Sequence, residues 1–138
     1  MRRTLLVGAA TATLAGALLA APTPASALPA PAAASGWDEW MNTEDADPGG
    51  RVQFARDGDV MRLCDLEADG WAVYLFVKDD TQQLSKYDYT IGGAGRCVEL
   101  RASLGAPYDL REGNNFYVYL ALTKNGTHRY IDDAVWKN

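Results

Sequence analysis

The sequence predicts an all-β fold, an antiparallel β-sandwich or barrel of about seven strands with Ig-like, Greek-key connections and one disulfide. Apolar and polar residues alternate with period two through most of residues 50–137, as they do in strands with one buried face. Turn-forming Gly, Asp and Asn residues recur about every 8 to 12 residues along this stretch. No long segment carries the periodicity of an amphipathic helix.

The beginning of the chain has the pattern of a secretory signal peptide over residues 1–27. Two arginines near the start precede an uncharged run at residues 5–21, and Ala-Ser-Ala at residues 25–27 fits signal peptidase. A membrane helix is the alternative, but the run is shorter than the roughly 20 residues that a bilayer requires. We therefore expect a secreted, extracellular protein without a membrane anchor, cleaved after Ala27 or, as a second candidate, after Ala34.

The rest of the chain divides into a tail and a folding unit. Residues 28–36 are rich in Pro and Ala and are predicted to be a flexible N-terminus. Residues 37–138 are predicted to form a single β domain of a common size for small secreted proteins. Loss of the signal removes two of the 13 basic residues and none of the 18 acidic ones, so the net charge changes from −5 to −7.

The two cysteines and the charge balance exclude several classes of function. Outside the cytoplasm an isolated cysteine pair forms a disulfide, so we expect a Cys64–Cys97 bridge that contributes about 3 to 4 kcal/mol. One histidine and two cysteines are too few for a structural zinc site. An acidic chain without a basic cluster is unsuited to nucleic acid. We expect no cofactor, no nucleic-acid partner and a monomer.

Strands and loops follow from the alternation and from the turn residues. The strands are predicted at residues 51–55, 60–65, 71–77, 87–91, 96–101, 115–123 and 128–136. The segment 71–77 is apolar on both faces, which favours a central strand. Residues 78–86 and 102–114 are predicted to be loops. A short helical turn is predicted over residues 35–41, where two tryptophans and a methionine have helical spacing.

Asn125 and Gly126 are the strongest local signal in the sequence. Both positions tolerate positive φ, so they predict a two-residue type I′ hairpin turn. That turn would set Leu120 opposite Ile131, and because opposed residues share a face, both would point into the core. The same register places Tyr130 on the opposite face.

Tyrosine and tryptophan are the most suggestive functional feature. Four Trp and seven Tyr exceed what one small core needs, and their flat apolar faces with polar edges suit protein partners or sugar rings. The candidate binding aromatics are Tyr117, Tyr119, Tyr130, Trp37 and Trp40. The three tyrosines are predicted to form a stripe opposite the core. The alternatives are a second buried face and ordinary cross-strand pairing.

A calcium site is an alternative reading of residues 65–70. Asp65, Glu67 and Asp69 alternate before a glycine at the sixth position, as at the start of an EF-hand loop. The twelfth position is Phe76, where a bidentate Glu belongs, and the flanks are predicted strands. An acidic β-turn explains the same residues, and otherwise we expect no metal.

Catalysis has little support in the sequence. His128 is the single histidine, it follows the hairpin turn, and no nucleophile elbow accompanies it. A carboxylate-dependent hydrolase needs two acids facing each other across a cleft, and the candidates for this rival hypothesis are Asp59, Asp65, Asp132 and Asp133. We predict no catalytic residue.

Several motifs together resemble small secreted proteins common in actinomycetes. They are the signal, F-x-x-D-G-D at residues 54–59, the Cys64-Asp65 pair followed by A-D-G-W at residues 68–71, and G-x-G-x-C at residues 93–97. The resemblance covers about residues 1–100. Many members of this group have no assigned activity, so the resemblance implies secretion and a β fold but no functional residue.

These observations predict a secreted, non-catalytic binding protein on a disulfide-bonded β scaffold. Its partner is expected to be an extracellular protein or a polysaccharide. An inhibitor of a secreted hydrolase is one form of this hypothesis, with residues 102–114 or 78–86 as its reactive segment. The alternatives are the small carboxylate-dependent hydrolase and a structural module of the cell surface. Solvent exposure of the Tyr and Trp side chains distinguishes among them.

Overall fold

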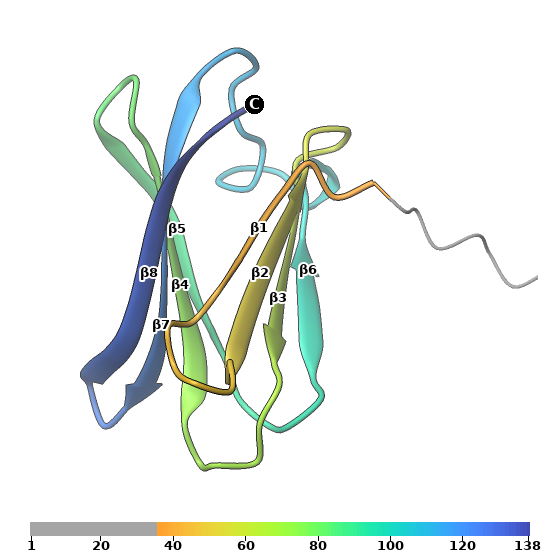
Figure 1. Ribbon diagram of the computed structural model, residues 1–138. Helices are drawn as coiled ribbons and strands as arrows, with labels where there is room; N and C mark the ends of the chain where they lie inside the picture. Colours follow the sequence, from red (N-terminus) through yellow and green to blue (C-terminus); the bar gives the residue numbers. More distant parts are fainter. Residues whose placement is uncertain (1–35) are drawn as a thin grey trace, which may run out of the picture. The chain divides into compact units, whose positions relative to one another are not determined.

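Two four-stranded antiparallel sheets form the fold in the computed structural model, which describes residues 36–138 (Figure 1). The first sheet has the order β1 (Glu39–Asn42), β2 (Gly50–Ala55), β3 (Val60–Asp65), β6 (Cys97–Leu100). The second has the order β5 (Leu84–Ile91), β4 (Ala72–Asp79), β7 (Asn115–Lys124), β8 (Thr127–Lys137). The predicted all-β sandwich with one disulfide is confirmed, with one strand more than expected.

The predicted signal peptide and nearly all of the predicted N-terminal tail lie outside the described residues. Within residues 36–138, no helix has the length and apolar character needed to cross a membrane. The helical content of this part is the short 3-10 turn η1 (Ala102–Leu104).

The chain passes between the sheets in a Greek-key manner. After β3 it crosses to the second sheet for β4 and β5, returns as β6 to lie beside β3, and crosses again as β7 to lie beside β4 (Figure 1). This return is the feature that distinguishes a Greek key from a simple meander. The segment predicted to be a central strand is indeed β4, which pairs with β5 on one side and β7 on the other.

The core lies between the two inner faces and follows from the period-two pattern. The alternation is clearest in two strands, because β2 buries Val52 and Phe54, and β4 buries Val73, Leu75 and Val77. The deepest large side chains are Phe54, Phe116, Met61, Leu63, Leu75 and Leu120. The two layers meet in direct ring contact, because the rings of Phe54 and Trp136 stack with centroids 6.1 Å apart.

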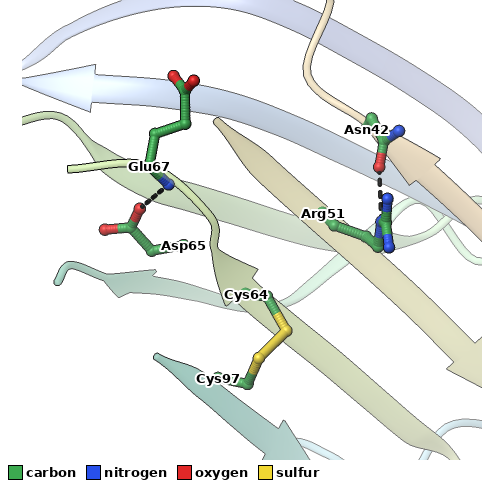
Figure 2. The surroundings of a disulfide bond; sticks show 6 residues. All are labelled: Asn42, Arg51, Cys64, Asp65, Glu67 and Cys97. Carbon is green, nitrogen blue, oxygen red and sulfur yellow. Dashed lines mark hydrogen bonds between the residues drawn. A yellow bond between two sulfur atoms is a disulfide. The ribbon is translucent and has the colours of Figure 1, made fainter. Parts of the chain in front are cut away.

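The disulfide joins Cys64 and Cys97, as predicted. These residues lie directly opposite each other on β3 and β6, so the bridge connects two strands of one sheet (Figure 2). Cys64 is buried and Cys97 is exposed. The bridge therefore ties the short edge strand β6 to the sheet from its outer side.

A β-bulge in β8 changes the predicted hairpin register. The turn itself is confirmed, with φ values of 51° at Asn125 and 77° at Gly126. Beyond it the register shifts, so Leu120 pairs with Asp132 and the predicted pairing with Ile131 is wrong. A bulge places one extra residue on its strand and reverses the faces that follow. Ile131 is accordingly 40% exposed instead of in the core.

Two predicted local structures are also wrong. A helical turn was predicted over residues 35–41, but their described part, residues 36–41, contains none, because it ends in the edge strand β1, which alternates between the core and solvent. Residues 78–86 are mostly strand, since β4 continues to Asp79 and β5 begins at Leu84. The polar residues there lie in the connecting turn and on solvent-facing strand positions, except Asp79, which is buried. The predicted long loop at 102–114 is confirmed and is anchored by the buried Leu110.

Candidate functional site

The five candidate aromatics lie on different surfaces. Trp40 projects from the outer face of the first sheet, and Trp37 lines hollows on that same face. Tyr117 and Tyr119 lie on the outer face of the second sheet. Tyr130 is at the bulge of β8, with a φ of 51° and 48% exposure. The structure therefore brings the two tryptophans together on one face and two of the three tyrosines together on the other.

Trp40 is the most exposed large apolar side chain of the described residues, at 61%. Its neighbour Met41 is buried, so the pleat directs Trp40 away from the core. In register across the sheet, Trp40 lies opposite Gln53, which lies opposite Arg62. The row continues to Glu99 on β6. A single exposed ring is thus followed by polar side chains across the first sheet.

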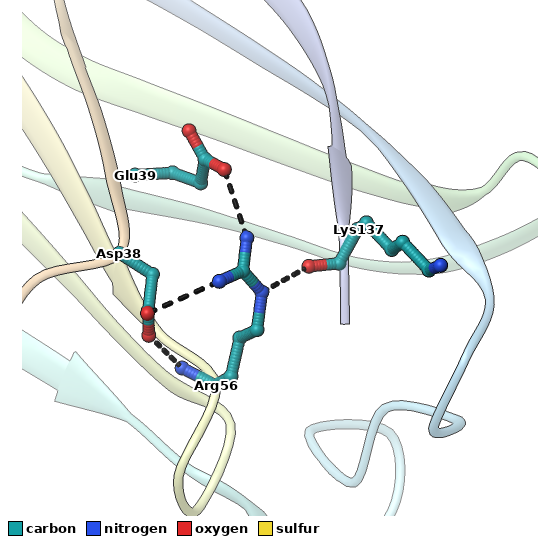
Figure 3. A network of polar contacts seen from close by, with 4 residues as sticks. All are labelled: Asp38, Glu39, Arg56 and Lys137. Carbon is teal, nitrogen blue, oxygen red and sulfur yellow. Dashed lines mark hydrogen bonds and ion pairs between the residues drawn. The ribbon is translucent and has the colours of Figure 1, made fainter.

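Arg56 holds the beginning of β1 in place (Figure 3). Its Nη1 donates to Asp38 at 3.1 Å and its Nη2 donates to Glu39 at 2.9 Å. Its Nε donates to the carbonyl oxygen of Lys137 at 2.7 Å. One guanidinium thus connects the residue after Trp37 with the end of β8 in the other sheet.

Thr43 and Gly50 hold the other end of β1. The Thr43 N–H donates to the Gly50 carbonyl at 3.0 Å, and the Gly50 N–H donates to Thr43 Oγ1 at 3.0 Å. A Cβ on Gly50 would lie 2.7 Å from Cγ1 of Val73 in the other sheet, so this close approach requires glycine. The strand that carries Trp40 is therefore anchored at both ends.

Two hollows flank Trp37 on the outer face of the first sheet. One of about 310 Å³ is lined by Gly36, Trp37, Trp40, Arg51 and Gln53. The other, of about 450 Å³, is lined by Gly36, Trp37, Ala55, Asp57, Val60, Arg62, Glu99 and Arg101. Both share Trp37, so we call the two hollows together the tryptophan groove. Its walls combine indole rings with guanidinium, amide and carboxylate groups.

The aromatic residues of the second sheet pack against one another. The rings of Tyr74 and His128 lie 4.6 Å apart, and Tyr119 OH lies 3.2 Å from His128 Nδ1. Burial, then Asp88 and Tyr119, raises the pKa of Tyr74. Burial and the adjacent Asp133 likewise raise the pKa of Tyr117. The rings of Tyr74, Tyr119 and His128 contact one another, in keeping with the alternative of cross-strand pairing.

The residues of the calcium alternative differ in burial and in their hydrogen-bond partners. Asp65 is buried, and its carboxylate accepts the N–H of Gly93 at 2.7 Å. It also accepts the N–H of Glu67 at 3.3 Å, a bond that Figure 2 shows. Asp69 is exposed and accepts the N–H of Trp71. Partial desolvation, followed by the nearby Asp47, raises the pKa of Glu67. Within residues 36–138, no group of three His, Cys, Asp or Glu side chains suits a metal ion.

The other buried carboxylates anchor loops. Asp59 accepts the Leu110 N–H and the Asn138 amide, each at 2.8 Å. Asp79 accepts the Gln82 N–H at 2.9 Å and the side-chain amide of Asn114 at 2.8 Å. These bonds link turns and loops at one end of the sandwich.

Burial opposes ionisation of Asp79, but the hydrogen bonds and Lys86 outweigh it. The pKa of Asp79 is therefore lowered. Of the remaining candidates for acid catalysis, Asp132 is half-buried and Asp133 is exposed on β8.

Sequence reasoning did not identify the polar lining of the tryptophan groove. Arg51, Gln53 and Arg62 alternate with core residues, so period two already places them on outer faces. Their meeting with Trp40 depends on β1 joining β2, and that pairing was hidden by the predicted helical turn. Comparisons of the chain with family models, curated proteins and solved structures found no match.

Proposed function

We propose that the protein is a secreted, non-catalytic polysaccharide-binding protein whose ligand lies in the tryptophan groove. The observation that carries this proposal is the 61% exposure of Trp40, on an anchored strand beside Trp37. A flat indole face removes apolar surface from water when it stacks on a sugar ring, and polar neighbours hydrogen-bond to the hydroxyl groups. The signal-like N-terminus and the disulfide favour an extracellular location.

The composition of the groove favours a polysaccharide over a protein partner. Beyond Trp40, the row across the sheet consists of Gln53, Arg62 and Glu99, which are all polar. The centre of a stable protein interface is depleted in Asp and Glu, whereas Asp57 and Glu99 line this groove. A hydroxyl-rich ligand uses both the ring and the polar row. The buried carboxylates serve as loop anchors, so we do not extend the proposal to a hydrolase.

Affinity electrophoresis in native gels that contain soluble polysaccharides tests the proposal. We expect the protein to be retarded by at least one polymer and Trp40→Ala to reduce its affinity by about tenfold or more, as for a central aromatic contact. Leu84→Ala is the matched control, because Leu84 is 57% exposed on the other sheet. It should bind like the wild type.

Two results would overturn the proposal. Loss of retardation in Tyr119→Ala with retention in Trp40→Ala would move the site to the second sheet. Absence of retardation in every polymer, combined with capture of a defined protein from culture supernatant, would replace the polysaccharide with a protein partner.

A further inference from the structure

Three arginines line the tryptophan groove, and they come from three neighbouring strands. Arg51 lies on β2, Arg62 lies on β3, and Arg101 follows β6 directly. The chain as a whole has 13 basic and 18 acidic residues. The groove therefore gathers guanidinium groups on one face of an acidic protein.

Two of these arginines keep donors available. Glu99 forms its ion pair with Arg101, although Arg62 is its partner in the strand register. Within residues 36–138, Arg62 therefore forms no ion pair. The Nε of Arg51 donates to Asn42 Oδ1 at 2.8 Å, which orients the guanidinium (Figure 2). That bond leaves both Nη groups of Arg51 without an ion-pair partner in the described part of the chain.

A guanidinium remains protonated in proteins and offers only donors, in a planar fork that matches a carboxylate. Arg51 and Arg62 are diagonal neighbours on adjacent strands, so their positions lie about 7–8 Å apart. We propose, on the basis of the function proposed above, that the ligand is an acidic polysaccharide bearing uronate carboxylates. A sugar ring stacks on Trp40, and a carboxylate is bound by Arg51 and Arg62.

The lining of the groove favours a polymer that offers both an anion and an apolar ring face. Asp57 and Glu99 lie beside the arginines, and Trp37 and Trp40 line the adjoining hollow, so an anion without a ring to stack would leave the indoles in contact with water. A polyuronate presents its carboxylates on otherwise uncharged rings. Each ring thereby supplies both the apolar face for the indole and the single anion for the guanidinium pair.

The experiment compares polygalacturonate with its carboxyl-reduced, neutral form in native affinity gels, using the disulfide-bonded protein. We expect the acidic polymer to bind about tenfold more tightly, an advantage that falls as salt screens the ion pairs. Arg62→Gln and Arg51→Gln should each remove much of this advantage and should lower binding of the neutral polymer far less, because the glutamine amide still donates hydrogen bonds to hydroxyl groups. Arg129→Gln, on the second sheet, makes the same charge change and should bind like the wild type.

The outcomes separate the two proposals. Equal binding of both polymers, unaffected by Arg62→Gln but lost in Trp40→Ala, overturns the uronate assignment and supports the proposed function. Preference for a phosphate-bearing wall polymer, sensitive to Arg62→Gln, also overturns the assignment of a carboxylate ligand. Absence of binding to every polymer overturns the proposed function itself.

Discussion

On the outer face of the second sheet, Tyr74, Tyr119 and His128 pack against one another, with Tyr119 OH 3.2 Å from His128 Nδ1. On the outer face of the first sheet, neither Trp37 nor Trp40 pairs with another aromatic ring of the described residues. Hollows lie beside the tryptophans instead. Rings that cover each other stabilise the sheet, whereas uncovered rings keep their faces for a ligand.

The two faces also differ in how their strands are held. The strands β4, β7 and β8 are 8 to 11 residues long and pair with one another along most of their length. The first sheet ends in two four-residue strands, β1 and β6. The hydrogen bonds of Arg56 hold β1 in place, and the disulfide holds β6. The proposed binding face is therefore the one whose geometry depends on individual residues.

The largest expected effect is on stability, from removal of the disulfide. The double variant Cys64→Ala/Cys97→Ala should lose about 3 to 4 kcal/mol of unfolding free energy, because the bridge closes a loop across 33 positions. Urea denaturation followed by tryptophan fluorescence measures the change. Wild-type protein under reducing conditions should reproduce it. A loss below about 1 kcal/mol would show that the backbone pairing of β6 with β3 is enough to hold β6 in place.

The next effect distinguishes the two faces directly. Tyr119→Ala should lower stability by about 1–2 kcal/mol, since it removes packing against Tyr74 and His128. Trp40→Ala should change stability by less than about 0.5 kcal/mol, as an exposed side chain does. Urea denaturation should therefore show a loss of stability in Tyr119→Ala, and affinity gels should show a loss of binding in Trp40→Ala. If Trp40→Ala proves the less stable of the two, Trp40 is a packing residue and its ring face is not free for a ligand.

These predictions rest on features that the sequence reveals unequally. Alternation in segments such as 71–77 predicted strands and core faces, because each strand must bury one face wherever it lies. The bulge at Tyr130 was not predictable, because a one-residue shift leaves the composition of the strand unchanged. The strand identity of β1 was also missed, since Trp37, Trp40 and Met41 fit helical spacing, and four residues are too few to show alternation clearly.

The site was predictable only in its individual residues. Exposed tryptophan and arginine positions can be recognised from periodicity, but their neighbours depend on strand order, which local sequence does not specify. The roles of Asp59, Asp65 and Asp79 illustrate the same limit. Each occurs at the end of a strand, where an acidic turn residue is ordinary, and the structure shows each one buried and bonded to distant or local loop groups.

A smaller effect on stability, with a clear effect on binding, is expected for Arg56→Ala. The ion pairs with Asp38 and Glu39 are partly exposed, so their loss should lower stability by less than about 1 kcal/mol. Polysaccharide affinity should nevertheless fall, because the start of β1 and Trp37 lose their anchor. Arg129→Ala is the control. Unchanged affinity in Arg56→Ala would show that Thr43 and Gly50 suffice to position the groove.

The smallest expected effect is on the pH dependence of stability and comes from Asp79, at the end of β4 in the second sheet. Its folded-state pKa lies below the ordinary value of 3.8, so in acid the unfolded state binds more protons at this site than the folded state. The contribution of Asp79 to the free energy of unfolding is complete at pH values above that ordinary pKa and is lost as the pH falls through the lowered pKa. Urea denaturation between about pH 5 and pH 2 should therefore show a shallower acid decline in Asp79→Asn than in the wild type. Asp79 supports the β4–β5 hairpin of the second sheet, whereas the tryptophan groove lies on the first sheet. The variant Asp79→Asn should therefore keep wild-type affinity for polysaccharide at neutral pH. A loss of affinity equal to that of Trp40→Ala would mean that the two faces are coupled, and the division between a packed face and a binding face would no longer hold.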